Sequence, residues 1–155
     1  MDREEVLRIL RSTPDEVQAV CEGLSDDQVR TRPAAEAWSL LEIACHLRDS
    51  AAEEGLRVRR LIEEEQPTLD AYDQEARARE REYQREDPRR ALTGLRAFWT
   101  GLAYQLEGLS EDEWQREGLH PEVGRVSVRS RAEDEVRHAR EHLAQMQDVR
   151  AALSG

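Results

Sequence analysis

The chain has 155 residues, of which 38% are hydrophobic and 37% charged, so we expect a single domain, 1–155, whose core is assembled from narrow apolar stripes. It carries 23 basic and 34 acidic side chains, a formal net charge of −11. Because this charge repels phosphate backbones and anionic lipids, we expect neither nucleic acid nor a membrane as a partner.

No apolar run approaches the roughly 20 residues that a membrane-spanning helix needs. The first residues, Met1-Asp2-Arg3-Glu4-Glu5, are acidic, whereas a signal peptide begins with basic residues. Both observations indicate a cytoplasmic location.

The first predicted helix carries a seam of residues spaced alternately by four and three, which is typical of a helix in a bundle: Val6, Leu10, Thr13, Val17, Val20 and Leu24. Pro14 interrupts this seam. Because proline lacks a backbone donor and is tolerated only in a first turn, we expect a kink or a short break near residues 12 to 14.

The second predicted helix begins at Ser39, which forms a Ser-x-x-Glu capping box with Glu42, and it fades by Gln66-Pro67. Its apolar seam has one charged member, Glu54. A carboxylate in such a seam lies either at a hydrated, frayed edge or near a functional site, and the sequence leaves both interpretations open.

Residues 73 to 87 carry dense charges of both signs, which indicates a solvated linker helix. The third long helix is predicted to start with Asp87 as its cap and Pro88 at its first position. Phe98 and Trp99 supply bulk beside its apolar stripe, and we expect both to belong to the core.

The segment 120–127 is predicted to be a loop, with Gly124 at a turn. The last helix is expected to run from Ser127 or Ser130 to Leu153. Four helices with short to medium connections predict an all-α protein, an antiparallel four-helix bundle.

Three of the four histidines carry the main functional signal. His138 and His142 are four residues apart on the last helix, so their rings share one face and can bind a single metal ion. His46 lies on the second helix, from which folding can bring a third ligand. All three flank the apolar seams, which suits an open cleft. A His-x-x-x-His pair on a charged helix is more often surface decoration, so the residues alone leave both interpretations open.

The surroundings of the histidines resemble the DinB/YfiT-like superfamily over essentially the whole chain. Its second-helix signature is similar to Trp38-Ser39-x-x-Glu42-Ile43-x-x-His46-Leu47-x-Asp49. Its later landmarks match, in the same order, His120-Pro121-x-x-Gly124-x-Val126-Ser127 and His138-x-x-x-His142-Leu143-x-Gln145-Met146. One departure is the stretch 129–135, which is more charged than the apolar helix start usual in these proteins.

The resemblance implies a four-helix bundle that holds one divalent metal ion through His46, His138 and His142. Members of known activity are mostly metal-dependent transferases that use a low-molecular-weight thiol of the bacillithiol or mycothiol type, with some isomerases and hydrolase-like proteins. The resemblance therefore implies a small-molecule substrate, and at the level of the family also a homodimer.

Three neutral imidazoles leave the full charge on the ion, which can lower the pKa of a water toward about 7 or hold a thiol as a thiolate. Zinc and nickel suit nitrogen ligands. Five side chains are candidates for orienting the imidazole rings: Asp49, Glu53, Glu54, Glu141 and Gln145. His120 precedes a proline in the predicted loop, and it lies either near the cleft or only in that loop.

The hypothesis that follows is a metal-dependent S-transferase that joins a small thiol to an electrophile. Two alternatives stay open. One is a metal-dependent hydrolase, and the other is a non-catalytic metal-binding protein of the stress response, whose bundle serves partner contact.

Overall fold

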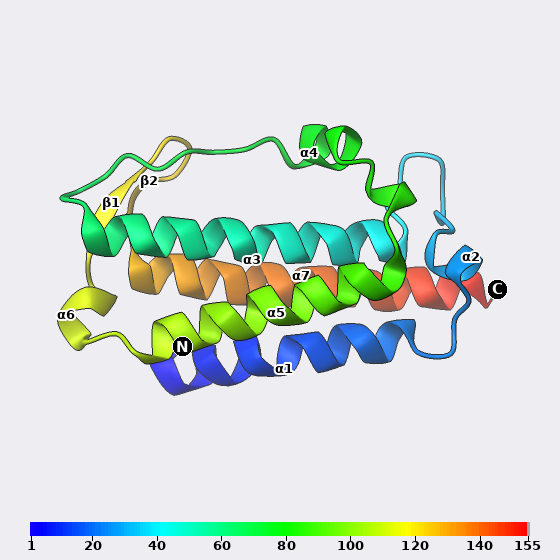
Figure 1. Ribbon diagram of the computed structural model, residues 1–155, viewed down its shortest axis with the longest axis horizontal. Coiled ribbons are helices and arrows are strands. Elements are labelled where there is room, and N and C mark those ends of the chain that lie inside the picture. Colours follow the sequence, from blue (N-terminus) through cyan, green and yellow to red (C-terminus); the bar gives the residue numbers. More distant parts are fainter. Residues whose placement is uncertain (155) are drawn as a thin grey trace.

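The computed structural model describes residues 1–154 as a bundle of four long helices (Figure 1). These helices are α1 (Arg3–Cys21), α3 (Leu40–Glu63), α5 (Pro88–Glu107) and α7 (Val128–Leu153). The predicted four-helix bundle is confirmed. None of the helices in the described part of the chain combines the length and apolarity needed to cross a membrane.

The predicted start of α3 is confirmed atom by atom. The Glu42 amide donates to Ser39 Oγ at 3.2 Å, and the Ser39 amide donates to Glu42 Oε1 at 3.0 Å. At the start of α5, the Asp87 carboxylate accepts from the Arg89 amide and Pro88 occupies the first turn. These caps satisfy amide groups that a helix leaves unpaired at its N-terminus, and they fix where each helix begins.

We expected a kink or a short break near residues 12 to 14. Helix α1 runs without a break through Pro14, so the prediction of a break is wrong. Pro14 is buried, as are Val17 and Val20 on the following turns. Thr13 Oγ1 donates to the Ile9 carbonyl at 2.7 Å, which adds a side-chain bond where the proline removes a backbone donor. Burial of the seam on both sides of the proline outweighs the lost backbone hydrogen bond.

The neighbouring helices run in both relative directions. Contacts between α3 and α5 advance together along the two helices, since Trp99 Nε1 donates to the Leu47 carbonyl and Gln105 Nε2 to the Gly55 carbonyl. These two helices are therefore parallel, as Figure 1 shows. The α3–α7 and α1–α5 pairs are antiparallel, as expected, whereas α1 and α7 run the same way.

The parallel pair is explained by the connection 64–87, which returns along the length of the bundle (Figure 1). Helix α3 has 24 residues and is about 36 Å long at 1.5 Å per residue, a span that this connection can cover. Only α4 (Gln74–Glu80) of the predicted linker helix is α-helical, followed by the 3₁₀ helix η1 (Tyr83–Arg85). The segment is not merely solvated, because Tyr83 is buried against α3.

The predicted loop 120–127 is part of a β-hairpin. Strand β1 (Glu117–His120) pairs antiparallel with β2 (Gly124–Ser127), and the connection joins β1 where the Leu69 amide donates to the Leu119 carbonyl at 2.7 Å. Gly124 has φ +83°, so its predicted place at a turn is confirmed. Two short helices, α2 (Asp26–Val29) and α6 (Glu111–Trp114), complete the chain.

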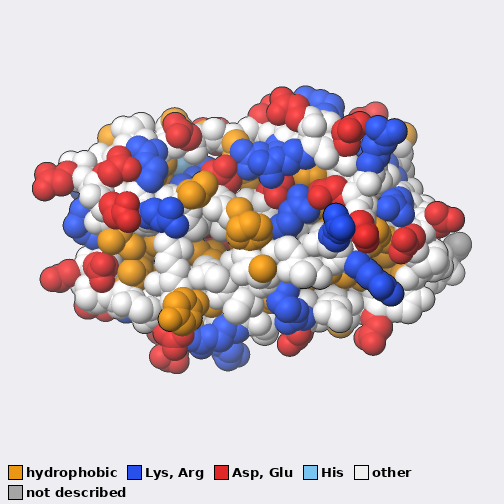
Figure 2. All heavy atoms as spheres, viewed as in Figure 1, with side chains coloured by type: hydrophobic (Ala, Val, Ile, Leu, Met, Phe, Trp, Pro, Cys, Tyr) orange, Lys and Arg blue, Asp and Glu red, His pale blue; other side chains and the backbone are white. Residues whose placement is uncertain are grey.

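Two adjacent aromatic residues on α5 have different environments. Trp99 is fully buried in the core, whereas Phe98 is 47% exposed, so the expectation that both are core residues is wrong for Phe98. On the face drawn in Figure 2, arginine and carboxylate side chains alternate without forming a patch of one sign.

Candidate metal centre

Three histidines meet between α3 and α7. The Nε2 atom of His138 lies 3.0 Å from Nε2 of His46 and 3.0 Å from Nε2 of His142. The three possible ligand atoms all lie within 4.8 Å of one another, and His46 is almost completely buried. The structure thus places the imidazoles of two distant segments around one point, as a shared metal ion requires.

The other ring nitrogens show which atoms face that point. His142 Nδ1 lies 2.7 Å from Gln145 Oε1, an acceptor, so Nδ1 carries the proton. Ser50 Oγ donates to Glu135 Oε1 at 2.6 Å and lies 3.2 Å from His138 Nδ1, which donates to it in turn. In neutral His138 and His142 the Nε2 atoms are then lone-pair donors that face each other.

This arrangement fits a tetrahedral divalent ion. Two nitrogens bound at about 2.0–2.1 Å around such an ion lie about 3.3 Å apart, which is close to the 3.0 Å that separates His138 Nε2 from each of the other two Nε2 atoms. The His46 and His142 ligand atoms lie within 4.8 Å of each other. Two lone pairs that face each other at such a distance repel, and a cation between them removes that repulsion.

Burial sets the charge state of the three rings. Desolvation, reinforced by the neighbouring histidines, lowers the pKa of His46 to about 3 and that of His138 to about 4. Burial also lowers the pKa of His142. The rings are therefore uncharged near neutral pH, which is the form that binds metal.

Of the five side chains predicted to orient the rings, Gln145 is hydrogen-bonded to a histidine. Asp49 instead accepts from the Tyr83 hydroxyl and from Arg48, and it pairs with Arg81. These contacts fasten the connection 64–87 to α3 beside the site.

None of the remaining three candidates forms a hydrogen bond with a histidine ring within residues 1–154. Glu53 pairs with Arg77 at 3.1 Å, and Glu141 is exposed. Glu54 is buried and accepts from both Arg57 and Arg131, so it is not a frayed edge of the seam.

Ser50, Glu135 and Trp38 were not predicted at the site. Two of them had a signal in the spacing, because Ser50 follows His46 by four residues and Glu135 precedes His138 by three, which places each near the same helix face. The Trp38 ring centre lies 5.1 Å from that of His46 and 6.4 Å from that of His142. Trp38 therefore covers one side of the histidine cluster.

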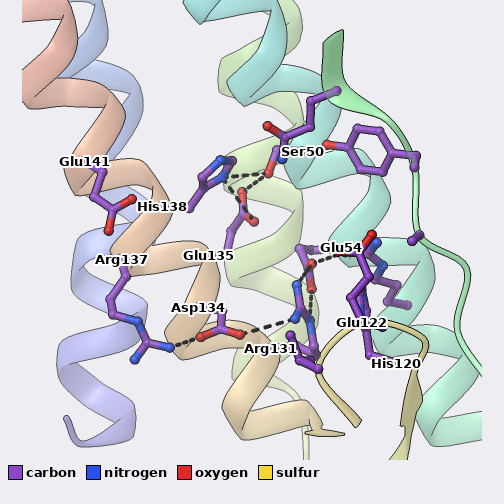
Figure 3. Close-up of a pocket in the computed structure, with 15 residues that line it drawn as sticks. Ser50, Glu54, His120, Glu122, Arg131, Asp134, Glu135, Arg137, His138 and Glu141 are labelled. Carbon is purple, nitrogen blue, oxygen red and sulfur yellow. Dashed lines mark hydrogen bonds and ion pairs between the residues drawn. The ribbon is translucent and has the colours of Figure 1, made fainter. Parts of the chain in front are cut away.

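A cavity of about 330 Å³ opens beside His138 (Figure 3). It lies between α3, α7, the β-hairpin and residues 71–74, and its wall includes Ser50, Glu135 and His120. His120, whose side chain is nearly buried, therefore lies near the cleft. A small molecule in the cavity has access to the side of the cluster next to His138.

The fold and the site together define a class of protein, a helical bundle with three converging histidines. The sequence profile of the DinB superfamily matches residues 9–146. The chain belongs to this superfamily.

Relatives of the chain extend over nearly its whole length. YfiT from Bacillus subtilis (strain 168) is 23% identical over 151 residues, which cover 95% of this chain and 83% of YfiT. OB0782 from Oceanobacillus iheyensis is 27% identical over 143 residues, 91% of this chain and 77% of the relative. Both are named provisionally as metal-dependent hydrolases.

The solved structure of YfiT aligns with a TM-score of 0.87 at 21% identity, covering 96% of this chain and 87% of YfiT. Its description is that of a probable metal-dependent hydrolase with an unusual four-helix bundle topology. The similarity establishes the fold of the present chain.

Proposed function

We propose that this protein binds one divalent ion, zinc or nickel, through His46, His138 and His142, and that it is a metal-dependent enzyme. The observation that carries the proposal is the convergence of three Nε2 atoms from α3 and α7. Membership of the DinB superfamily and the names of the relatives support it.

The reaction proposed first is the transfer of a low-molecular-weight thiol, of the bacillithiol or mycothiol type, to a small electrophile. A bound divalent ion supplies positive charge that favours the deprotonated form of a thiol or a water. Gln145 and Ser50 hold the Nδ1 protons of two rings, so their Nε2 lone pairs stay directed at one point. Trp38 covers one side, and the cavity beside His138 receives the reactants.

The second candidate is a metal-dependent hydrolase. The names of YfiT and OB0782 favour it, and the same site could activate water in place of a thiol. The two candidates differ only in the nucleophile that reaches the centre.

The test is to purify the protein without a histidine tag, measure its metal content by inductively coupled plasma mass spectrometry, and assay it with a thiol panel and with ester and amide substrates. We expect about one equivalent of metal and turnover with a thiol and an electrophile. His46→Ala should lose both metal and turnover. His120→Ala is the matched control for metal content, because it removes the histidine outside the cluster and should retain the ion.

Ester or amide hydrolysis without thiol transfer would favour the hydrolase. Stoichiometric metal without turnover would favour a non-catalytic stress-response or interaction protein. Protein that takes up no zinc or nickel would contradict the proposal.

A further inference from the structure

The cavity beside the histidine cluster has a second end that carries hydrogen-bond donors. Figure 3 shows His138 on one side of it and Arg131 with His120 on the other. Arg57 also lines the cavity. A ligand whose reactive group lies at His138 therefore extends toward these three residues.

His120 presents a donor of fixed identity. The Glu122 backbone amide donates to His120 Nδ1 at 3.1 Å, so this nitrogen must be an acceptor. The proton of the neutral ring is then on Nε2, which forms no hydrogen bond within residues 1–154. Burial, with Arg57 and Arg131 nearby, lowers the pKa of His120 and so favours the neutral ring.

Arg57 and Arg131 place two nearly buried guanidinium groups at the same end of the cavity. Both donate to the single carboxylate of Glu54, at 2.6 Å and 2.5 Å. Within residues 1–154, Arg57 Nε is the one buried side-chain nitrogen or oxygen without a hydrogen-bond partner. An unpaired donor of this kind is unfavourable unless a ligand supplies the acceptor.

The acidic residues of the lining are mostly engaged with other groups. Glu54 accepts from the two arginines, Asp134 pairs with Arg131 and Arg137, and Glu135 accepts from Ser50. The two remaining carboxylates, Glu122 and Glu141, are exposed, where solvent screens them. Among the residues that line the cavity, Arg57 Nε and His120 Nε2 are thus hydrogen-bond donors without a partner within residues 1–154.

We infer that this end of the cavity is a subsite for a carboxylate, and that the substrate pair includes a small carboxylic acid whose anion binds His120 Nε2 and the Arg57 guanidinium. The inference rests on the proposed function for the reaction at the other end of the cavity. The subsite itself needs no metal, because its donors belong to the β-hairpin and α3. Planar guanidinium groups match the geometry of a carboxylate, and the neutral imidazole adds a third donor.

The test is the binding of benzoate and of its uncharged analogue benzamide. Calorimetry gives the affinities for the protein as purified and after removal of metal by chelation, and NMR of the His120 ring nitrogens reports contact directly. Benzoate should bind and shift the signal of His120 Nε2. Its affinity for the protein should exceed that of benzamide by about tenfold or more.

Variants separate the subsite from general charge effects. His120→Phe keeps a ring but removes both nitrogens, and Arg57→Met removes the guanidinium while Glu54 remains paired with Arg131. Each should weaken benzoate binding about tenfold or more. Arg125→Met, on β2 of the same hairpin with its side chain 79% exposed, removes the same charge and should change little. Circular dichroism establishes that each variant is folded.

Two further acids locate the carboxylate within the substrate pair. Stronger displacement of benzoate by 3-mercaptopropionate than by propionate assigns the carboxylate to the thiol, and equal displacement assigns it to the electrophile. Either result supports the subsite.

Equal binding of benzoate and benzamide, or equal losses in Arg57→Met and Arg125→Met, would overturn the inference. So would a failure of benzoate to bind folded protein that takes up zinc, a result that leaves the proposed metal centre intact. If benzoate binds to protein that takes up neither zinc nor nickel, the carboxylate subsite is supported and the proposed metal centre is contradicted.

Discussion

Helix α3 has two neighbours of opposite character. Toward α5 its contacts are largely apolar, with Trp99 buried and its indole nitrogen satisfied by the Leu47 carbonyl. Toward α7 the same helix presents His46, Ser50 and Glu54, all buried and all in close contact with polar groups of α7.

Under the proposed function, α5 contributes mainly stability, and α7 contributes the residues of the candidate metal centre. Burying polar groups costs free energy unless each finds a partner, and an apolar interface of equal size is usually no less stable. The concentration of such groups along one interface, next to a cavity, is typical of a functional site and supports the proposed function.

The largest expected effect on stability is at the apolar interface. Trp99→Ala should lower the free energy of unfolding by about 3–5 kcal/mol, because a large side chain leaves a cavity in the core. Urea denaturation measures the loss. Metal content of the protein that remains folded should not change, and a selective loss of metal would contradict the separation of roles.

At the polar interface, Ser50→Ala should weaken metal binding about 10–100-fold, because His138 loses the oxygen that accepts its Nδ1 proton. Competition with a chromophoric chelator measures the affinity. Ala52→Ser, a substitution of similar size two residues along α3, is the control and should retain wild-type affinity. Equal affinities in wild type and Ser50→Ala would show that this oxygen does not support the ring.

The polar interface should also make stability depend on pH. The pKa of His46 is about 3 in the folded chain and about 6.5 when exposed, so between these values only the unfolded chain takes up this proton. The contribution of His46 to the stability of the metal-free protein should therefore become more unfavourable as pH decreases below 6.5. Glu135 acts in the opposite direction, because burial and Glu54 raise its pKa to about 8 and its contribution is lost as pH rises toward that value.

Comparison with His46→Leu isolates the contribution of His46 to the pH dependence of stability. Both proteins are first freed of metal by chelation. Between pH 7.5 and pH 5, the free energy of unfolding of the wild type should fall by up to about 2 kcal/mol more than that of the variant. The measurement is urea denaturation at both values. Parallel losses in the two proteins would mean that His46 is not buried as an uncharged ring.

The smallest effect is expected for Phe98, the neighbour of Trp99. Phe98→Ala should change the free energy of unfolding by no more than about 0.5 kcal/mol in the monomer, because its side chain is 47% exposed. The same denaturation experiment compares both variants. A loss as large as that of Trp99→Ala would show that this face of α5 is covered, as it would be in the expected homodimer.

Local features of the fold were predictable, whereas the path of the chain was not. Ser39 with Glu42, and Asp87 with Pro88, fix helix starts through contacts within a few residues, so sequence alone is sufficient. The direction of α5 depends on the return of residues 64–87 along the bundle. No local pattern encodes this path, although the length of the connection permits it.

In the candidate metal centre, too, local features were predictable from the sequence and contacts between distant segments were not. His138 and His142 lie together because of their helical spacing. His46 was a candidate third ligand from its place on another predicted helix, and the family pattern assigned it to the same site. The pairing of Glu54 with Arg131 joins residues 77 apart, so a carboxylate that looked out of place in the seam could not be assigned its partner in advance. The charged stretch 129–135, a departure from the family pattern, supplies Arg131 and Glu135 to the wall of the cavity.

X-ray absorption spectroscopy of the protein purified without a tag tests the central claim most directly. The account predicts one zinc or nickel ion with three imidazole nitrogens, at about 2.0–2.1 Å for zinc, and loss of that signal in His46→Ala. A first shell of oxygen or sulfur without imidazole, or an unchanged spectrum in His46→Ala, would contradict it.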